Sequence, residues 1–157
     1  MRLTRFLMPM TVVLLLMASI GVALAQNAHF TRASASGPSN QGNVTVNFKI
    51  AGLGDNETLT VTASADATAE YACRNKGGNF PSDPKKQQVS GPVTASGEFT
   101  SGKNGQITGS LTLSPPASTL NCPGGQEEVL LNVSYTNVEV STNGVSEAIP
   151  GTFSRTF

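Results

Sequence analysis

Two cysteines are the residues of this chain with the most specific chemistry. Cys73 ends a run of alternating residues, and Cys122 stands in the short sequence Asn-Cys-Pro-Gly-Gly-Gln. No Cys-x-x-Cys spacing and no second cysteine cluster occur, which makes a redox or metal-binding pair the weaker interpretation. Two cysteines in an exported chain most often form a disulfide, and this one would span 122 − 73 = 49 positions. We therefore expect Cys73 and Cys122 to be paired.

Residues for acid–base catalysis are scarce. Serine and cysteine hydrolases need a histidine to move a proton. The only histidine, His29, lies four residues after Ala25, where we expect a signal peptide to be cleaved, and a chain end is usually mobile. Glu127 and Glu128 are adjacent, so on a strand they would point to opposite faces and could not form the carboxylate pair of a glycosidase. We expect no catalytic residue and a protein that is not an enzyme. The alternative is a secreted hydrolase with carboxylates from separate strands, such as Asp66, Glu70 or Glu98.

Metal and cofactor sites lack their full patterns. Asp55, Asn56 and Glu57 place oxygen ligands on a turn, but a calcium site needs six or more ligands. The Gly52-Leu53-Gly54 sequence lacks the third glycine and the following helix of a dinucleotide-binding loop. We therefore expect no metal site and no cofactor.

The segment after Cys73 is the best candidate for binding. It is predicted as a loop from Arg74 to Gln88, because it contains glycine and proline without periodicity. A loop held at its base by a disulfide is a common recognition surface, and a surface glycan or a protein is the expected partner. A solvated loop kept soluble by its lysines remains the alternative. The candidate residues are Arg74, Asn75, Lys76, Asn79, Phe80, Lys85 and Lys86.

The N-terminal residues have the pattern of a secretory signal peptide. Arg2 and Arg5 precede an apolar run from Thr11 to Ile20, and Ala23-Leu24-Ala25 has the form of a cleavage site. The apolar run is shorter than the roughly 20 residues of a comfortable membrane span, so an uncleaved anchor is the weaker alternative. We expect cleavage after Ala25, a secreted, periplasmic or cell-surface protein, and no membrane span after cleavage.

The mature chain is expected to be a single domain over residues 26–157. Without Arg2 and Arg5, eight basic residues face ten acidic ones, a net charge of −2. A nucleic-acid-binding domain would need a concentrated basic surface, so no nucleic-acid partner is expected.

Alternating apolar and polar residues predict the strands. The pattern is faint in Ala28–Ser36, strong in Asn43–Ile50 and continuous from Leu59 to Cys73, where the odd positions are apolar. The alanines between Ser64 and Ala72 could instead form a helix, because alanine is the best helix former. Glycine-rich turns separate these segments.

The second half continues the pattern. Strands are expected at Val89–Phe99 and Ile107–Leu113, paired as a hairpin through Lys103-Asn104-Gly105. In Val129–Val140 the apolar positions change phase, which predicts a bulge or a crossing to another sheet. Asn143-Gly144 predicts another turn, and Val145–Phe157 predicts a broken strand that Pro150 places at an edge.

About seven short strands predict an all-β fold, an antiparallel β-sandwich that is immunoglobulin-like in the loose sense and has one disulfide. Trp is absent, so the antibody pattern of a tryptophan packed on a central bridge is not met.

Four runs of residues resemble a known family: AGLG at Ala51–Gly54, ATAEYACRNKGG at Ala67–Gly78, CPGGQ at Cys122–Gln126 and VSYTNV at Val133–Val138. The family comprises small secreted, mostly bacterial proteins of unknown function. The resemblance covers most of the mature chain and is most specific in the two cysteine motifs. It implies an exported single domain with Cys73 paired to Cys122, and it implies no activity or site residues.

Overall fold

The computed structural model describes residues 27–157, so the expected signal peptide lies outside the described residues. Every regular element in this range is a strand, which confirms the all-β prediction. No helix within residues 27–157 has the length and apolar character needed to cross a membrane. The strands are β1 (His29–Ser36), β2 (Val44–Ala51), β3 (Thr58–Asn75), β4 (Lys86–Thr100), β5 (Ile107–Leu113), β6 (Gln126–Thr142), β7 (Val145–Ile149) and β8 (Phe153–Thr156).

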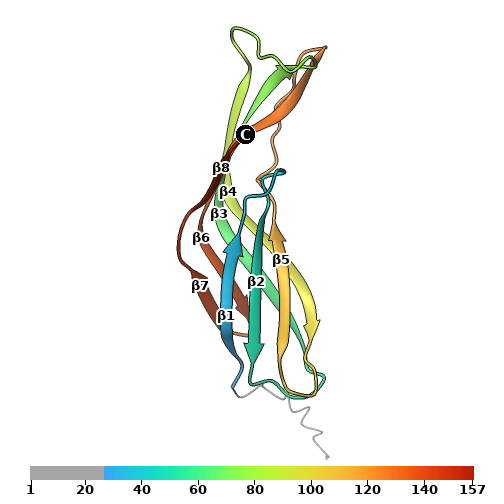
Figure 1. Cartoon of the computed structure of the whole chain (residues 1–157), viewed down its shortest axis with the longest axis vertical. Coiled ribbons are helices and arrows are strands. Elements are labelled where there is room, and N and C mark those ends of the chain that lie inside the picture. The colour runs from blue at the N-terminus through green and yellow to red at the C-terminus, as the bar shows by residue number, and fades with distance from the viewer. Residues whose placement is uncertain (1–26) are drawn as a thin grey trace, which may run out of the picture.

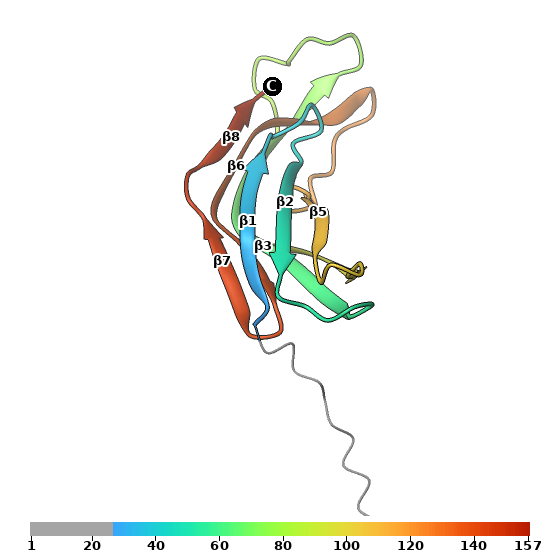
Figure 2. The same cartoon turned by 60° about the horizontal axis from the view of Figure 1, so that its bottom comes forward.

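The strands form two antiparallel sheets that pack face to face (Figures 1 and 2). The smaller sheet has the order β1-β2-β5, and the larger has the order β4-β3-β6-β7, with β8 also paired to β6. The predicted sandwich is therefore confirmed. The expected broken last strand is two separate strands, interrupted at Pro150-Gly151, so the described chain has eight strands where about seven were expected.

The core lies between the sheets and follows the alternation in the sequence. On β2 the side chains of Val44, Val46, Phe48 and Ile50 are buried, because successive residues of a strand face opposite sides. Phe48 packs edge to face on Phe99 of β4, with ring centroids 5.0 Å apart. Burial of these branched and aromatic side chains is the main stabilising contribution, since each removes apolar surface from water.

β3 is a strand along all of its 18 residues, so the helix alternative for the alanine-rich segment is wrong. Both of its edges are paired, to β4 and to β6, and these backbone hydrogen bonds outweigh the helix preference of alanine. The odd positions from Leu59 to Ala69 are buried as expected, and Cys73 is buried further along.

One predicted strand pairing is wrong. β5 pairs with β2, and β4 pairs with β3, so Lys103-Asn104-Gly105 does not close a hairpin. The turn instead carries the chain from one sheet to the other. It is attached to the β2–β3 connection, because Leu53 N donates to Gly105 O at 3.1 Å and the buried Ser101 Oγ donates to Gly54 O at 2.6 Å. Both connections cross the sandwich at the same end.

The phase change in β6 is a bulge, which was one of the two expected explanations; the other was a crossing to another sheet. Asn137 has a φ of 51° and is the extra residue where the register with β3 shifts. The β6–β7 hairpin also follows its sequence, because Asn143 and Gly144 have φ values of 41° and 79°, as a tight turn with two left-handed residues requires.

The larger sheet is much longer than the smaller one. β3 has 18 residues and would span about 60 Å, whereas the eight residues of β2 span about 26 Å. The ends of β3, β4 and β6 therefore extend beyond the smaller sheet (Figure 1). A segment that we call the strap, residues 114–125, connects β5 to β6 and runs beside this extension. The extension carries the predicted binding loop at its end.

Candidate functional site

The candidate site is the end of the extension, which we call the tip: the loop of residues 76–85 and the strand ends that support it. The loop is shorter than expected. Arg74 and Asn75 belong to β3, and Lys86, Gln87 and Gln88 belong to β4, because the β3–β4 ladder continues to the pair Ala72 and Lys86. The sequence could not show this, since these residues do not alternate in hydrophobicity.

The predicted disulfide is present. Cys73 of β3 and Cys122 of the strap are joined by an S–S bond of 2.05 Å, with their Cα atoms 5.5 Å apart. The bond fastens the strap to the larger sheet, whereas the bridge of antibody domains joins the two sheets. Cys73 is fully buried, so the bond forms part of the packed base of the tip.

Three of the four candidate cations have partners within the tip. Arg74 Nη2 lies 2.8 Å from Glu127 Oε1, and Lys86 Nζ lies 3.5 Å from Glu70 Oε1. Lys85 Nζ donates to the Asn121 carbonyl oxygen of the strap at 3.1 Å. These groups are partly exposed, and such pairs contribute about 0–1 kcal/mol each. Arg74 and Lys86 therefore join neighbouring strands of the larger sheet, Lys85 joins the loop to the strap, and all three are poorer candidates for contact with a ligand.

Backbone hydrogen bonds give the loop a defined shape. Asn75 N donates to Asn79 O at 3.0 Å, and Gly78 N donates to Asn75 O at 2.8 Å. Gly78 has a φ of 90°, a conformation that favours glycine. Lys76 N also donates to Gly125 O at 3.1 Å, which connects the loop to the end of the strap. The main chains of the candidate residues Asn75 and Asn79 thus help to fix the shape of the loop.

A polar network that no sequence pattern indicated holds the strap against β4. Gln87 Nε2 donates to Thr119 Oγ1 at 2.9 Å, and Gln87 Oε1 accepts from Thr119 N at 3.0 Å. Ser118 Oγ lies 2.8 Å from both Gln87 Oε1 and Glu128 Oε2. Glu127 and Glu128 thus have different partners, as expected from their opposite faces. Because Gln87 lies 31 and 32 positions from Ser118 and Thr119, no local pattern could have indicated these contacts.

Tyr71 fixes the start of the strap. Its hydroxyl donates to the Pro116 carbonyl oxygen at 2.8 Å, so the ring is half-buried between β3 and the strap. Burial raises the pKa of Tyr71 above its ordinary value of 10.0, and the charge of Glu128 raises it further. Burial also raises the pKa of Tyr135 well above the ordinary value, with a smaller effect of Tyr71.

These pKa shifts predict destabilisation by alkali. A folded-state pKa above the unfolded value of 10.0 favours the native state fully below that value, and this contribution is lost as the pH rises above 10. We expect the unfolding free energy, measured by urea titration, to fall between pH 10 and 12. The Tyr71→Phe/Tyr135→Phe variant should show a shallower fall over the same pH range, and an identical slope would contradict the assignment.

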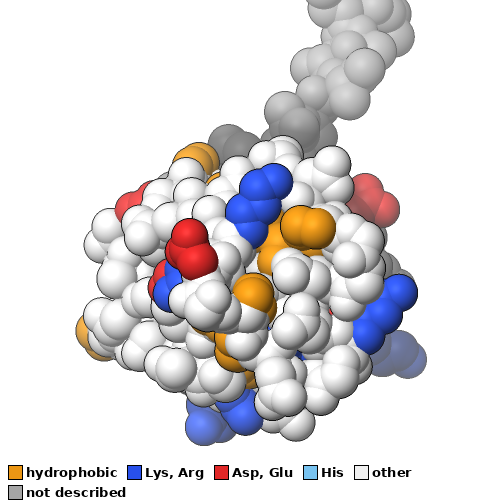
Figure 3. Space-filling model, turned by 90° about the horizontal axis from the view of Figure 1, so that it is seen from above, with side chains coloured by type: hydrophobic (Ala, Val, Ile, Leu, Met, Phe, Trp, Pro, Cys, Tyr) orange, Lys and Arg blue, Asp and Glu red, His pale blue; other side chains and the backbone are white. Residues whose placement is uncertain are grey.

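Phe80 and Lys76 are the candidate residues of the loop whose side chains are best suited to contact a partner. Phe80 is 47% exposed, and among the described residues Phe157 is the other large hydrophobic residue that is exposed, at 45%. Lys76 is exposed and has no salt-bridge partner within residues 27–157. Viewed onto this end, the molecule presents apolar and basic side chains next to one another within a mostly polar surface (Figure 3).

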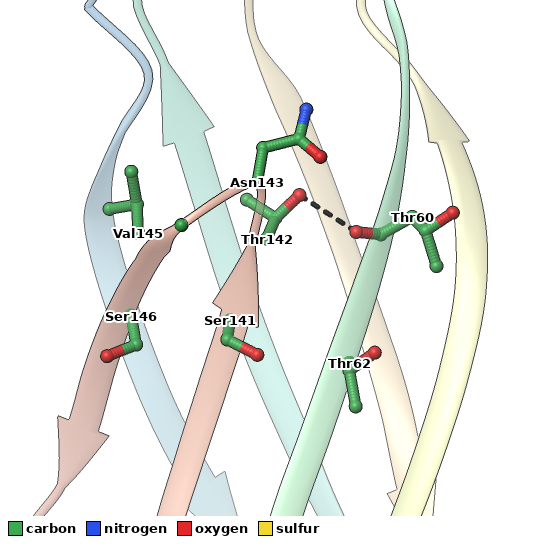
Figure 4. Close-up of a pocket in the computed structure, with 8 residues that line it drawn as sticks. Thr60, Thr62, Ser141, Thr142, Asn143, Val145 and Ser146 are labelled. Carbon is green, nitrogen blue, oxygen red and sulfur yellow. Dashed lines mark hydrogen bonds between the residues drawn. The ribbon is translucent and has the colours of Figure 1, made fainter.

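A polar groove lies near the β6–β7 hairpin. It has a volume of about 540 Å³, and Thr142 Oγ1 donates to the Thr60 carbonyl oxygen at 2.8 Å beside it (Figure 4). Its side chains are hydroxyls, one amide and one valine, so it offers hydrogen bonds without a group that could transfer a proton at neutral pH. The lining residues are Thr60, Thr62, Ser141, Thr142, Asn143, Gly144, Val145 and Ser146.

The histidine and the acidic side chains of residues 27–157 are the remaining candidates for catalysis or metal binding. His29 begins β1, is exposed, and has its Nδ1 2.7 Å from the Asn27 carbonyl oxygen. No group of three or more histidine, cysteine, aspartate or glutamate side chains in the described chain is arranged to hold a metal ion. Comparisons of the chain with protein-family models, with curated proteins and with solved structures gave no match.

Proposed function

We propose that the chain is a non-catalytic exported protein that binds a surface glycan or a protein partner through its tip, in a binding, adhesion or envelope-structural role. The observation that carries the proposal is the exposed aromatic ring of Phe80 on a loop with a defined backbone. The signal-peptide pattern and the disulfide support export. As part of the same proposal, the sandwich is immunoglobulin-like in the loose sense, and the chain is related to the secreted family of unknown function that its sequence resembles.

The energetics favour Phe80 as the main contact. Full burial of a phenylalanine side chain contributes about 1.5–3 kcal/mol, whereas an exposed ion pair contributes about 0–1 kcal/mol. A loop held by a disulfide and by its own backbone bonds loses little conformational freedom on binding, which lowers the cost of association. Lys76, four positions before Phe80 on the same loop, supplies a charge for orientation.

The test is a pull-down with the purified mature protein against the envelope and culture-fluid fractions of the producing cells. The Lys76→Ser/Phe80→Ser variant should retain less than about a tenth of the captured partner, as expected for the loss of an aromatic contact. The control is Lys103→Ser/Phe157→Ser, which removes one exposed cation and one equally exposed ring elsewhere. Equal capture by both variants and by the unmodified protein would refute binding through the tip.

The strand register shows which acidic residues lie near one another, as the hydrolase alternative requires. A glycosidase needs two carboxyl groups about 5–9.5 Å apart. Asp66 and Glu70 are four positions apart on β3, about 13 Å, and Glu98 faces Thr60, about 20 Å from Asp66 along the strand. The register therefore brings no two of these three residues opposite one another on neighbouring strands.

One pair of acidic residues lies close together on neighbouring strands. Glu139 of β6 faces Ser64, which makes it a diagonal neighbour of Asp66 across the bulge in β6. The Asp66 carboxylate accepts a hydrogen bond from Asn137 Nδ2 at 2.8 Å. Turnover of a polysaccharide that disappears in both Asp66→Asn and Glu139→Gln would favour the hydrolase over the proposed binding role.

A further inference from the structure

The outward face of the smaller sheet is a regular array of polar side chains. Its strand register places outward-facing residues in three rows across β1, β2 and β5, because residues two positions apart on a strand share a face. This face is turned toward the viewer in Figure 1. The rows are Arg32, Lys49 and Thr108; then Ser34, Asn47 and Ser110; then Ser36, Thr45 and Thr112.

The first row places two cations side by side. Arg32 and Lys49 are direct cross-strand neighbours, an arrangement of like charges that is destabilising by itself. The sequences of β1, β2 and β5 contain no aspartate or glutamate. Neither cation takes part in a salt bridge within the described chain, where the ion pairs involve Arg74 and Lys86. An uncompensated pair of this kind is suited to an external anion.

The two cations border a groove of about 350 Å³ on this face. Ser34, Asn47 and Thr108 also line it, and the backbone of Phe48 and Gly109 forms its floor, because the Phe48 ring is buried on the other side of the sheet. The groove thus combines a guanidinium, an ammonium, an amide and two hydroxyl groups. Arginine binds a carboxylate in a planar, two-point geometry, and the hydroxyls and amide suit the hydroxyls of a sugar.

We propose that this groove binds an acidic polysaccharide with carboxylates on its sugar rings. One sugar carboxylate lies between Arg32 and Lys49, and the following sugars lie along the rows that contain Asn47 and Thr45. The outward-facing polar rows continue beyond the groove and suit an extended polymer. Nucleic acid fits less well, because two cations without an exposed aromatic platform cannot follow a phosphate backbone and stack its bases. This site is independent of the tip, which lies on the other sheet.

The test uses oligogalacturonate of defined length, titrated into the mature protein by calorimetry at low salt. Its fully methyl-esterified form is the matched ligand, because it keeps the hydroxyls and loses the charges. We expect the esterified form and the Arg32→Gln/Lys49→Gln variant each to reduce affinity by about tenfold or more. Binding should weaken as salt rises, since exposed charges are screened.

The matched protein control is Lys103→Gln/Arg155→Gln, which removes one exposed lysine and one exposed arginine outside the groove and outside the tip loop. It should bind oligogalacturonate as the unmodified protein does. Equal losses in the two double variants would overturn the proposal, because the effect would then be one of net charge. Binding of inorganic phosphate without binding of oligogalacturonate would also overturn it, since the groove would then be a simple anion site.

Discussion

The Cys73→Ala/Cys122→Ala variant is expected to lose about 4 kcal/mol of unfolding free energy, because the disulfide closes a loop with a sequence separation of 49. For a domain of this size the melting temperature should fall by roughly 15 °C. The expected loss is large because the substitutions give the unfolded chain more conformational freedom. The folded chain gains nothing in return, since it keeps the β3–β6 ladder around Cys73 in either case.

Urea titration monitored by circular dichroism measures this loss. Dithiothreitol should lower the stability of the unmodified protein to that of the variant and should not affect the variant. A difference below about 1 kcal/mol between the two proteins would contradict the stabilising role of the disulfide, since loop closure alone predicts several times that value.

The Tyr135→Ala variant is expected to lose about 3–5 kcal/mol, the range for removing a large aromatic side chain from a core. Tyr135 is the largest of the fully buried side chains, and its hydroxyl donates to the Gly42 carbonyl oxygen at 2.8 Å. Tyr135→Phe keeps the ring and leaves that carbonyl without its partner, so its loss should be about 1–3 kcal/mol.

Chemical denaturation of the two variants separates packing from hydrogen bonding. The control is Thr136→Ala, because the next residue on β6 is exposed and should change stability by no more than about 0.5 kcal/mol. If Tyr135→Ala cost no more than Tyr135→Phe, the packed ring would not contribute as this structure implies.

The strands could be predicted from the sequence wherever one face of a strand is buried. The buried residues from Val44 to Ile50 alternate without a break, and those from Val133 to Val140 alternate on each side of the bulge, so the period-two pattern was visible in both segments. The sheet partner of β5 could not be predicted in this way. A turn such as Lys103-Asn104-Gly105 fixes a local reversal, whereas the choice between β4 and β2 depends on which sheet the strand completes.

The location of the candidate site was predictable, but its internal contacts were not. A cysteine followed by cations and glycine marked the loop around Phe80. The partners of Arg74 and Lys85 lie 53 and 36 positions away, so only the folded chain shows that these cations are already engaged. The pairing of Arg32 with Lys49 likewise depends on a register that includes a bulge in β1.

Site-specific photo-crosslinking tests binding through the tip most directly. A benzophenone amino acid replaces Phe80 in one protein and Phe157, which is equally exposed, in another. Both proteins are irradiated with the envelope and culture-fluid fractions of the producing cells. We expect one discrete crosslinked product from position 80 and none from position 157. The same products from both positions, or no product from position 80, would contradict a partner bound at the tip.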